Sequence, residues 1–229
     1  MSFPLRYAIL IDGGFLIHKI KERNRGTPPN ADQVEAIAKA IAQHECVQGQ
    51  TLLRTYFYHA RPATGPLKNP ISGETIELGA TDIHAQSESL LATLELRADF
   101  ALRLGETSTN EWKLGQKALR SLFRKPRPIE ARDLVPNIEQ KGVDLRIGLD
   151  IARLSLTQSV QSIVAVTGDS DLIPAFKFAR REGLRIFLCH LDHGVKRDLK
   201  AHADRIVEVD LTQILGAQTR ATAARKNGE

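Results

Sequence analysis

Short, continuous apolar runs alternate along the chain with longer stretches in which apolar residues recur every three or four positions. The continuous runs are rich in β-branched residues, which is typical of strands covered on both faces. The longer stretches have the period of amphipathic helices. These patterns predict strands at residues 7–11, 52–59, 100–104, 163–166, 185–189 and 206–209. They predict one helix that starts at residue 15, and further helices at 34–44, 83–94, 145–156, 173–183 and 195–203. Because strands and helices alternate, we expect parallel crossovers and a layered α/β sheet.

Residues 143–156 fit the period of a strand as well as that of a helix. The first nine residues alternate as a strand would, whereas Leu145, Leu149 and Leu156 recur at helical spacing. The segment is longer than a typical strand, so the helix is the favoured prediction.

Three other segments show neither period. The density of Pro, Gly, Asn and Ser at about 61–80 predicts an irregular insertion or a small hairpin. A basic segment at about 106–137 has room for a short strand and a helix. Residues 216–229 lack periodicity and are predicted to be a flexible basic tail. The remainder is expected to form one domain at residues 1–215.

The composition is typical of a soluble globular protein, with 42% hydrophobic and 26% charged residues. No segment approaches the roughly 18 apolar residues that a membrane span needs. The first residues also lack the apolar core of a secretory signal. We therefore expect a cytoplasmic protein without a membrane partner.

Thiolate and imidazole ligands for a metal are few. Cys46 and Cys189 lie far apart, which fits a reducing compartment and excludes a zinc cluster made of cysteine alone. His190, Asp192 and His193 follow a predicted strand and could hold a metal, although polar residues are common in such loops.

The charge of the chain points weakly to a polyanionic partner. The net charge is +5 and the pI is about 9.3. The cations are densest at 106–137, where aromatic residues are interleaved with them. Such a segment could bind a phosphate backbone or stack on bases, but a solvated charged face is the commoner outcome of a charge run.

Acidic residues follow two of the predicted strands directly. Asp12 comes after the first run, and Asp169 and Asp171 come after the run at 163–166. Each acid lies between the carboxyl end of a strand and the start of a helix, which is where open parallel sheets bind ligands. The alternative is that these residues only cap helices. Of the last two, Asp169 is the stronger candidate for a ligand because it lies nearer the strand end, and Asp171 has the stronger claim to a capping role.

A fourth acid, Asp144, falls in the first turn of the helix predicted at 145–156, where the helix dipole favours a carboxylate. Asp150 lies ~240° further round that helix and should not share its site. Converging carboxylates repel one another unless a cation compensates them. Oxygen ligands without thiolates favour Mg²⁺ or Mn²⁺, and such an ion can activate water for attack on a phosphodiester.

Three acidic elements of the chain resemble the motifs of a known family. They are Asp12 with its Gly-Gly turn, the stretch Lys141-Gly142-Val143-Asp144, and the stretch from Thr167 to Asp171. In this order they resemble the NYN domain, a PIN-like nuclease family that includes the bacterial LabA-like proteins, over about residues 5–210. Many members carry Asn shortly after the first acid, whereas this chain has Gly14 followed by Phe15.

The resemblance implies a PIN-like three-layer α/β/α fold with a mainly parallel sheet, and metal-dependent cleavage of RNA. It maps the catalytic and metal-binding roles, with Mg²⁺ or Mn²⁺, onto Asp12, Asp144, Asp169 and Asp171. Substrate contacts are expected from Gly13, Gly14, Lys141, Ser170, Lys196 and Arg197. The alternatives are a catalytically weak or inactive RNA-binding or regulatory assembly module, and a hydrolase of small phosphate esters. A homo-oligomer is left open.

Overall fold

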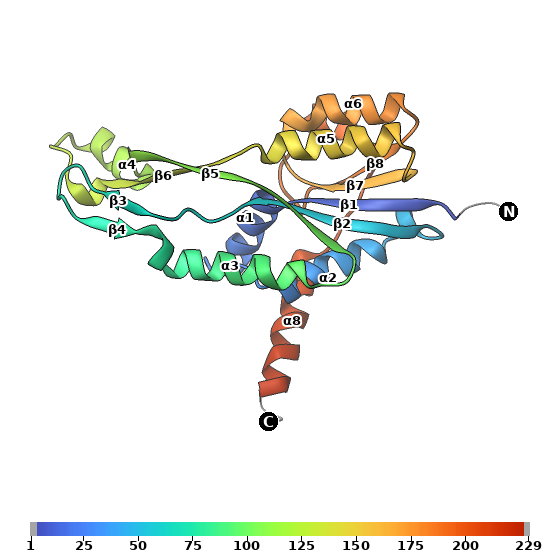
Figure 1. The fold of residues 1–229 in the computed structure, drawn as a ribbon, viewed down its shortest axis with the longest axis horizontal. Coiled ribbons are helices and arrows are strands. Elements are labelled where there is room, and N and C mark those ends of the chain that lie inside the picture. The colour runs from blue at the N-terminus through green and yellow to red at the C-terminus, as the bar shows by residue number, and fades with distance from the viewer. Residues whose placement is uncertain (1–3, 227–229) are drawn as a thin grey trace.

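The computed structural model describes residues 4–226, apart from the side chains of residues 110 and 219–226. Its centre is a seven-stranded sheet with the order β6-β5-β2-β1-β7-β8-β9 (Figure 1). All neighbouring strands are parallel except β5 and β6. The strands are β1 (Arg6–Asp12), β2 (Thr51–Ala60), β5 (Phe100–Leu114), β6 (Leu134–Lys141), β7 (Ser162–Val166), β8 (Arg185–Cys189) and β9 (Arg205–Ile206), and the pair β3 (Pro66–Lys68) and β4 (Thr75–Glu77) forms a separate hairpin.

Helices cover both faces of this sheet, which gives the three-layer α/β/α arrangement expected from the sequence (Figure 1). The helices are α1 (Gly13–Arg23), α2 (Ala31–Ala42), α3 (Asp82–Glu95), α4 (Gln116–Arg124), α5 (Val143–Leu156), α6 (Ile173–Arg181), α7 (Arg197–Ala201) and α8 (Leu211–Lys226), with short 3-10 turns η1 (Glu45–Val47), η2 (Leu78–Ala80), η3 (Ala131–Asp133) and η4 (Ser170–Leu172). Helices α1, α2, α3 and α8 pack on one face, and α5, α6 and α7 on the other.

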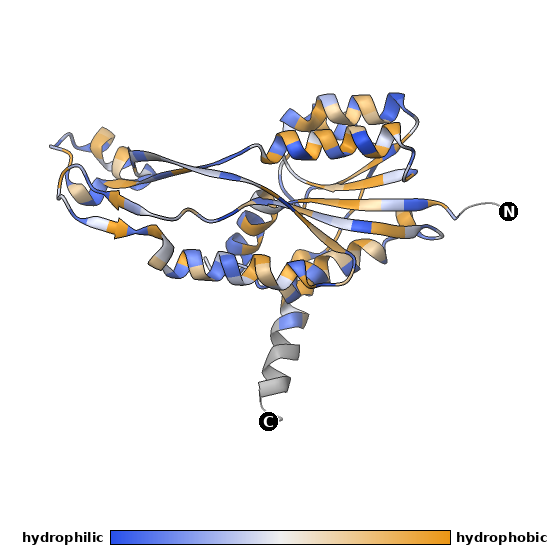
Figure 2. Ribbon diagram, viewed as in Figure 1, coloured by the Kyte–Doolittle hydropathy of each residue, from blue (hydrophilic) through white to orange (hydrophobic). Residues whose placement is uncertain are grey.

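Strand β1 shows why the central strands read as continuous apolar runs. Ile9 and Ile11 pack into the core beneath α1 and α2, whereas Ala8 and Leu10 pack into the core beneath α5 and α6. Because each face is covered by helices, every position from Tyr7 to Ile11 is buried, and the run ends at Asp12. Figure 2 shows the same concentration of apolar residues on β1, β7 and β8.

Helix α5 confirms the prediction of a helix at 145–156, but the leucines that indicated it lie outward. Leu145 and Leu149 are 66% and 60% exposed. The core is instead filled by Val143, Ile147 and Ile151, which belong to the alternating pattern. The segment is apolar on two sides, and this is why both periods fitted it.

Strand β5 differs from the prediction of a short strand that ends at Gly105. It pairs with β2 as far as Gly105 and then continues to Leu114 beside β6 alone. A Cβ atom on Gly105 would lie 2.5 Å from the carbonyl oxygen of Lys141. The glycine therefore permits a close crossing of two backbones and does not end the strand. We call residues 106–141 the arm.

The arm contains the segment at 106–137 and extends beyond the edge of the main sheet (Figure 1). The segment at 61–80, predicted as an irregular insertion or a small hairpin, contains the β3–β4 hairpin, which lies beside the arm. Trp112 Nε1 donates a hydrogen bond of 2.8 Å to the Lys68 carbonyl oxygen, and Asn69 Nδ2 donates one of 3.3 Å to the Ala131 carbonyl oxygen. The hairpin thus braces the arm.

The end of the chain also differs from its prediction. Helix α8 runs from Leu211 to Lys226, where a segment without regular structure was expected from residue 216. Its sequence is rich in Ala, Gln, Arg and Lys, which favour helix by intrinsic propensity without any apolar stripe to reveal it. Residues 227–229 of the predicted tail lie outside the described residues. Within the described part of the chain, no helix is long and apolar enough to cross a membrane.

Candidate active site

Asp12 ends β1 and caps α1, so both of its carboxylate oxygens are held. Oδ1 accepts a hydrogen bond of 3.0 Å from the Phe15 backbone N–H, and Oδ2 accepts one of 3.4 Å from the Thr167 hydroxyl. The oxygen of that hydroxyl also accepts a bond of 3.1 Å from the Asp169 N–H. Since β1 and β7 are parallel neighbours, Thr167 joins the carboxyl ends of the two strands.

Asp169, and not Asp171, is the capping residue here, and the metal-binding roles expected of both stay predictions. Asp169 caps η4 by accepting a hydrogen bond of 2.9 Å from the Asp171 N–H. The Asp171 side chain is exposed and makes no hydrogen bond within residues 4–226. The prediction that Asp171 was the cap was wrong because a 3-10 turn begins at Ser170 and is capped by Asp169, and α6 then follows Leu172 without a side-chain cap.

The charges of the four acids act on one another. Burial, helped by the charges of Asp144 and Asp169 and opposed by the hydrogen bonds from Phe15 and Thr167, raises the pKa of Asp12 to about 6. Burial also raises the pKa of Asp144, in the first turn of α5, with added repulsion from Asp169 and Asp171. The three chain segments therefore bring their acids to the same edge of the sheet.

Within the part of the chain that the structure describes, no cation pairs with these acids to compensate their negative charge. Among the ion pairs of the described residues, none involves any of these four acids. Their oxygen ligands suit Mg²⁺ or Mn²⁺. In the described part of the chain, however, no three His, Cys, Asp or Glu side chains are already close enough together to hold a metal, and this includes the group around His190. Carboxylates that repel one another would have to move inward to share an ion.

Asp150 lies on the same helix as Asp144 but belongs to another cluster, as its helical position predicts. It accepts hydrogen bonds of 3.0 Å from the Tyr58 hydroxyl, 2.9 Å from Arg103 Nε and 3.3 Å from Arg153 Nε. Burial, and then the Asp150 charge, raise the pKa of Tyr58. These partners satisfy Asp150, so it is not a candidate ligand.

The two glycines after Asp12 have different surroundings. A Cβ atom on Gly13 would lie 2.6 Å from the Tyr58 carbonyl oxygen, so this glycine is needed for packing against β2. A Cβ atom on Gly14 would lie 3.4 Å from Asp12 Oδ1 and 3.9 Å from Gln140 Oε1. Both are ordinary van der Waals distances, so a side chain would fit at this position, and the substrate contact expected of Gly14 stays a prediction.

Gln140 and His59 are neighbours of the site that sequence reasoning missed. Gln140, near the end of β6, places its Nε2 atom 3.2 Å from His59 Nδ1. Burial, and then the charge of Lys21, lower the pKa of His59 to about 4, so its imidazole is neutral at pH 7. Only the pairing of β5 with β6 brings Gln140 here, and no local pattern in the sequence signals that pairing.

Phe15 occupies the region where many NYN domains are expected to have a polar side chain. Its ring meets His193 edge-on at a centroid distance of 5.7 Å. Both rings close over Gly168, where a Cβ atom would lie 2.7 Å from the Phe15 ring and 2.8 Å from the His193 ring. An aromatic pair thus borders the turn that carries Asp169.

The remaining predicted substrate contacts lie around this edge. Lys141 is exposed at the end of β6, three residues before Asp144. Ser170 is half-buried at the start of η4, and Lys196 and Arg197 are exposed where α7 begins. Their contact with a substrate stays a prediction.

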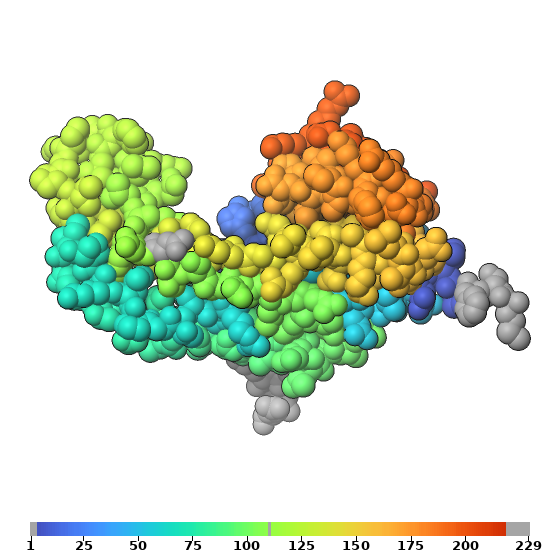
Figure 3. All heavy atoms as spheres, turned by 45° about the horizontal axis from the view of Figure 1, so that its top comes forward, coloured from blue at the N-terminus to red at the C-terminus, as the bar shows by residue number. Residues whose placement is uncertain are grey.

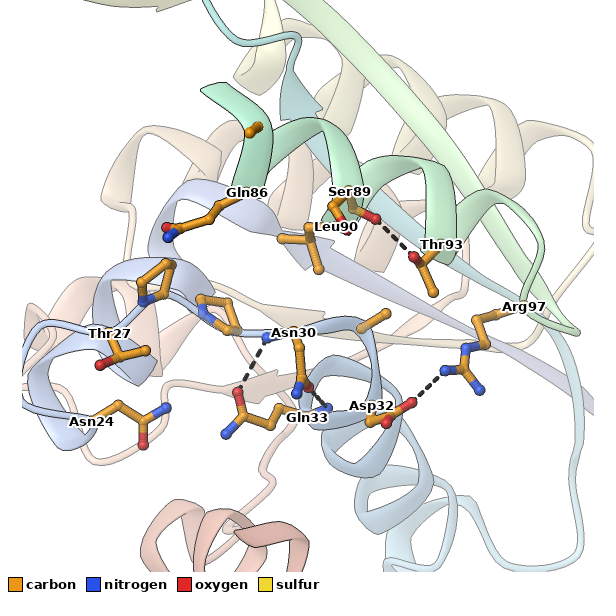
Figure 4. Close-up of a pocket in the computed structure, with 14 residues that line it drawn as sticks. Asn24, Thr27, Asn30, Asp32, Gln33, Gln86, Ser89, Leu90, Thr93 and Arg97 are labelled. Carbon is orange, nitrogen blue, oxygen red and sulfur yellow. Dashed lines mark hydrogen bonds and ion pairs between the residues drawn. The ribbon is translucent and has the colours of Figure 1, made fainter. Parts of the chain in front are cut away.

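Of three cavities in this region, one is lined by two of the acids and one lies beside Gly14. One of about 470 Å³ is bordered by Gly14, His59 and Gln140. Another of about 400 Å³ lies between α5 and α6 and is bordered by Asp144 and Asp171. A cavity of about 690 Å³ lies between α3 and the segment around the start of α2, and none of the four acids lines it (Figure 4).

Comparison with known proteins supports the fold and the family. A crystal structure of a protein of unknown function from Vibrio parahaemolyticus has a TM-score of 0.51 and 16% identity, covering 92% of this chain and 97% of that one. An uncharacterized protein of Methanocaldococcus jannaschii is 26% identical over 74 residues, which are 32% of this chain but only 31% of that protein's length.

The model of the NYN domain matches residues 103–210. Asp144, Asp169 and Asp171 lie within the matched segment, and Asp12 lies before it. The resemblance inferred from the acidic motifs is thus confirmed over residues 103–210, where this chain matches the model of the NYN domain.

Proposed function

We propose that this protein is a metal-dependent ribonuclease that hydrolyses phosphodiester bonds of RNA. One observation carries the proposal. Four carboxylates from three separate segments lie toward the carboxyl edge of the sheet without a compensating cation in the described residues, and burial together with the charge of neighbouring acids raises the pKa of Asp12 and Asp144. The match to the NYN domain supports a nuclease, because that family is PIN-like.

Asp12, Asp144, Asp169 and Asp171 would hold Mg²⁺ or Mn²⁺. When bound, the ion would supply neutralisation of phosphate charge and a lower pKa for an attacking water. The protein's own part is to hold the acids. Thr167 and the Phe15 N–H fix both oxygens of Asp12, while the exposed Asp144 and Asp171 lie toward solvent, where a substrate enters. Lys141, Lys196 and Arg197 would neutralise flanking phosphates.

The test is cleavage of a labelled single-stranded RNA by purified protein with Mn²⁺ or Mg²⁺. Asp169→Asn should abolish cleavage, whereas Asp82→Asn should leave it unchanged. Asp82 is a matched control because it is an exposed acid in the first turn of α3, away from the site. Equal activity of the wild type and Asp169→Asn would mean a contaminating nuclease and would overturn the proposal.

A second candidate function is an RNA-binding or regulatory module with weak or no turnover. The observation that favours it is Phe15, whose ring packs over Gly168 at the place where many NYN domains carry Asn. Tight RNA binding without cleavage under any divalent ion, and without a metal-induced rise in Tm, would favour this module. Hydrolysis of p-nitrophenyl phosphate without cleavage of RNA would point instead to small phosphate esters.

A further inference from the structure

We propose that the arm is a binding surface for the phosphate backbone of a nucleic acid strand whose reacting phosphate lies at the acids. This inference rests on the proposed function for the position of the reacting phosphate. It adds a second contact region far from the acids. A nucleic acid must therefore exceed a minimum length to contact both regions at once.

The topology places the arm beyond the candidate active site. Asp12 is level with Tyr58 of β2, and Tyr58 is level with Arg103 of β5. Strand β5 then continues past this edge to Leu114. Eleven residues at ~3.4 Å each extend roughly 37 Å, or less with twist. At ~3.4 Å per nucleotide of a stacked strand, about ten nucleotides separate the acids from the tip.

The tip of the arm is strongly basic. Residues 111–135 contain seven Lys or Arg and three Asp or Glu, a net charge of +4 against +5 for the whole chain. Four cations on and just after α4 are exposed, and no ion pair or hydrogen bond of their side chains occurs in the described structure: Lys117, Arg120, Arg124 and Lys125.

Other cations of the tip have a structural role. Arg127 donates two hydrogen bonds, of 2.6 and 2.7 Å, to Asp133, and Arg132 pairs with Glu130 at 2.7 Å. The bonds from Arg127 and from the Glu130 N–H lower the pKa of Asp133 to about 2. The turn before β6 is therefore fixed by its own contacts, and the α4 cations remain available to a partner.

The arm has almost no core of its own. Among the described side chains of residues 106–141, only Asp133 is buried. Phe123 is 81% exposed between the basic residues of α4. An exposed aromatic ring among cations suits stacking on a base next to phosphate contacts. A second copy of this chain fits less well, because two surfaces of like charge would repel.

The shape of the molecule leaves room for a strand. Figure 3 shows a hollow between the lobe formed by the tip of the arm and the layer formed by α5 and α6. Strand β6 crosses from the tip to the start of α5, where Asp144 lies (Figure 1). A strand bound at the acids can thus continue through the hollow to α4.

Binding without metal tests the arm separately from cleavage. Fluorescence anisotropy in EDTA would follow a labelled 20-nucleotide RNA, and a DNA of equal sequence, over a salt series. The variant Lys117→Gln/Arg120→Gln/Arg124→Gln/Lys125→Gln should bind the RNA at least about tenfold more weakly at low salt. Its slope of log K against log salt should fall by about 3, since each lost contact to a single strand removes ~0.7.

The matched control removes four charges elsewhere: Arg6→Gln/Arg54→Gln/Lys177→Gln/Arg181→Gln. Arg6 and Arg54 lie toward the opposite edge of the sheet, Lys177 and Arg181 lie on α6, and all four are exposed. This control should bind within about twofold of the wild type, allowing for long-range charge effects. A four-nucleotide RNA should bind both variants and the wild type alike, because it cannot reach from the acids to α4.

If the α4 variant and the control variant lose RNA affinity equally, only the net charge of the protein matters, and the inference is overturned. It is also overturned by unchanged binding of the α4 variant together with dissociation of a dimer in sedimentation, which would make the arm a contact between copies. If the α4 variant loses affinity for the RNA and for the DNA to the same extent, the arm recognises the phosphate backbone alone. If the wild type cleaves RNA but the α4 variant binds RNA normally, the inference about the arm fails while the proposed function stands. If RNA binding depends on α4 but no RNA is cleaved, the inference about the arm stands while the proposed function fails.

Discussion

At Asp12 a single carboxylate is a helix cap, a partner of Thr167 and a candidate metal ligand. Its folded pKa of about 6 lies above the ordinary value of 3.8, so the folded state keeps its proton over a range of pH in which the unfolded chain has lost it. A raised pKa contributes stability that is present below about pH 4 and is lost as the pH rises through about 6. The metal-free protein is therefore destabilised by its own site at neutral pH.

Asp12→Asn should raise the free energy of unfolding of the metal-free protein by roughly 1–3 kcal/mol at pH 8, and by much less at pH 4. Asn can still accept the Phe15 N–H bond, so the cap is kept while the charge is removed. Urea unfolding in EDTA at the two pH values measures this difference. The same change in stability at both pH values would contradict the explanation by charge.

Metal should reverse that loss of stability in the wild type. At a Mn²⁺ concentration of about 100 times its Kd, the free energy of unfolding should rise by ~2.7 kcal/mol, seen as a higher Tm. Asp12→Asn and Asp144→Asn should show little of this rise, and Asp82→Asn should show all of it. A rise in Asp12→Asn equal to that of the wild type would place the ion elsewhere.

At the scale of single elements, the failures of sequence reasoning have specific causes. Glycine usually interrupts strands, so Gly105 predicts the end of one, but here it lets β5 cross closely over Lys141. The leucines that predicted α5 lie on its exposed side, and the prediction was still correct because both sides of α5 are apolar. Helix α8 has propensity without periodicity, so no apolar stripe marks it in the sequence.

Gly105→Ala should lower the free energy of unfolding by about 1–3 kcal/mol, because the new Cβ would lie 2.5 Å from a backbone oxygen that cannot turn away. Gly148→Ala on α5 is the control, since nothing lies within 4 Å of the position that its new methyl group would occupy, and alanine should stabilise the helix by up to ~1 kcal/mol. Thermal unfolding of both variants measures the contrast. If Gly105→Ala leaves the free energy of unfolding unchanged, β5 and β6 separate easily at this point.

At the scale of the whole molecule, the sequence predicts the body far better than the arm. The strands β1, β7 and β8 are buried on both faces, and burial leaves a continuous apolar run that is plain in the sequence. Parallel topology then places the acids that follow such strands at one edge. The arm and the approach of Gln140 to His59 depend on the pairing of β5 with β6, which the chain specifies through distant contacts and not through a local pattern.

This contrast predicts two levels of protection in hydrogen exchange. Peptides from β1 and β7 should exchange slowly, while peptides from 106–141 should exchange early, because that segment buries one side chain among those described. Mass spectrometry with and without a 20-nucleotide RNA in EDTA would measure both levels. RNA should slow exchange in the arm, whereas equally slow exchange of arm and body without RNA would show a stability that the contacts do not explain.

The Thr167 hydroxyl, which bonds Asp12 and the Asp169 amide, also joins distant parts of the chain. Asp12 precedes its partner Thr167 by 155 residues. Until β7 has joined β1, the carboxylates are scattered along an unfolded chain and have no shared ion to bind. The proposed cleavage of RNA should therefore begin only once the sheet is complete, and a partly unfolded copy should leave surrounding RNA intact.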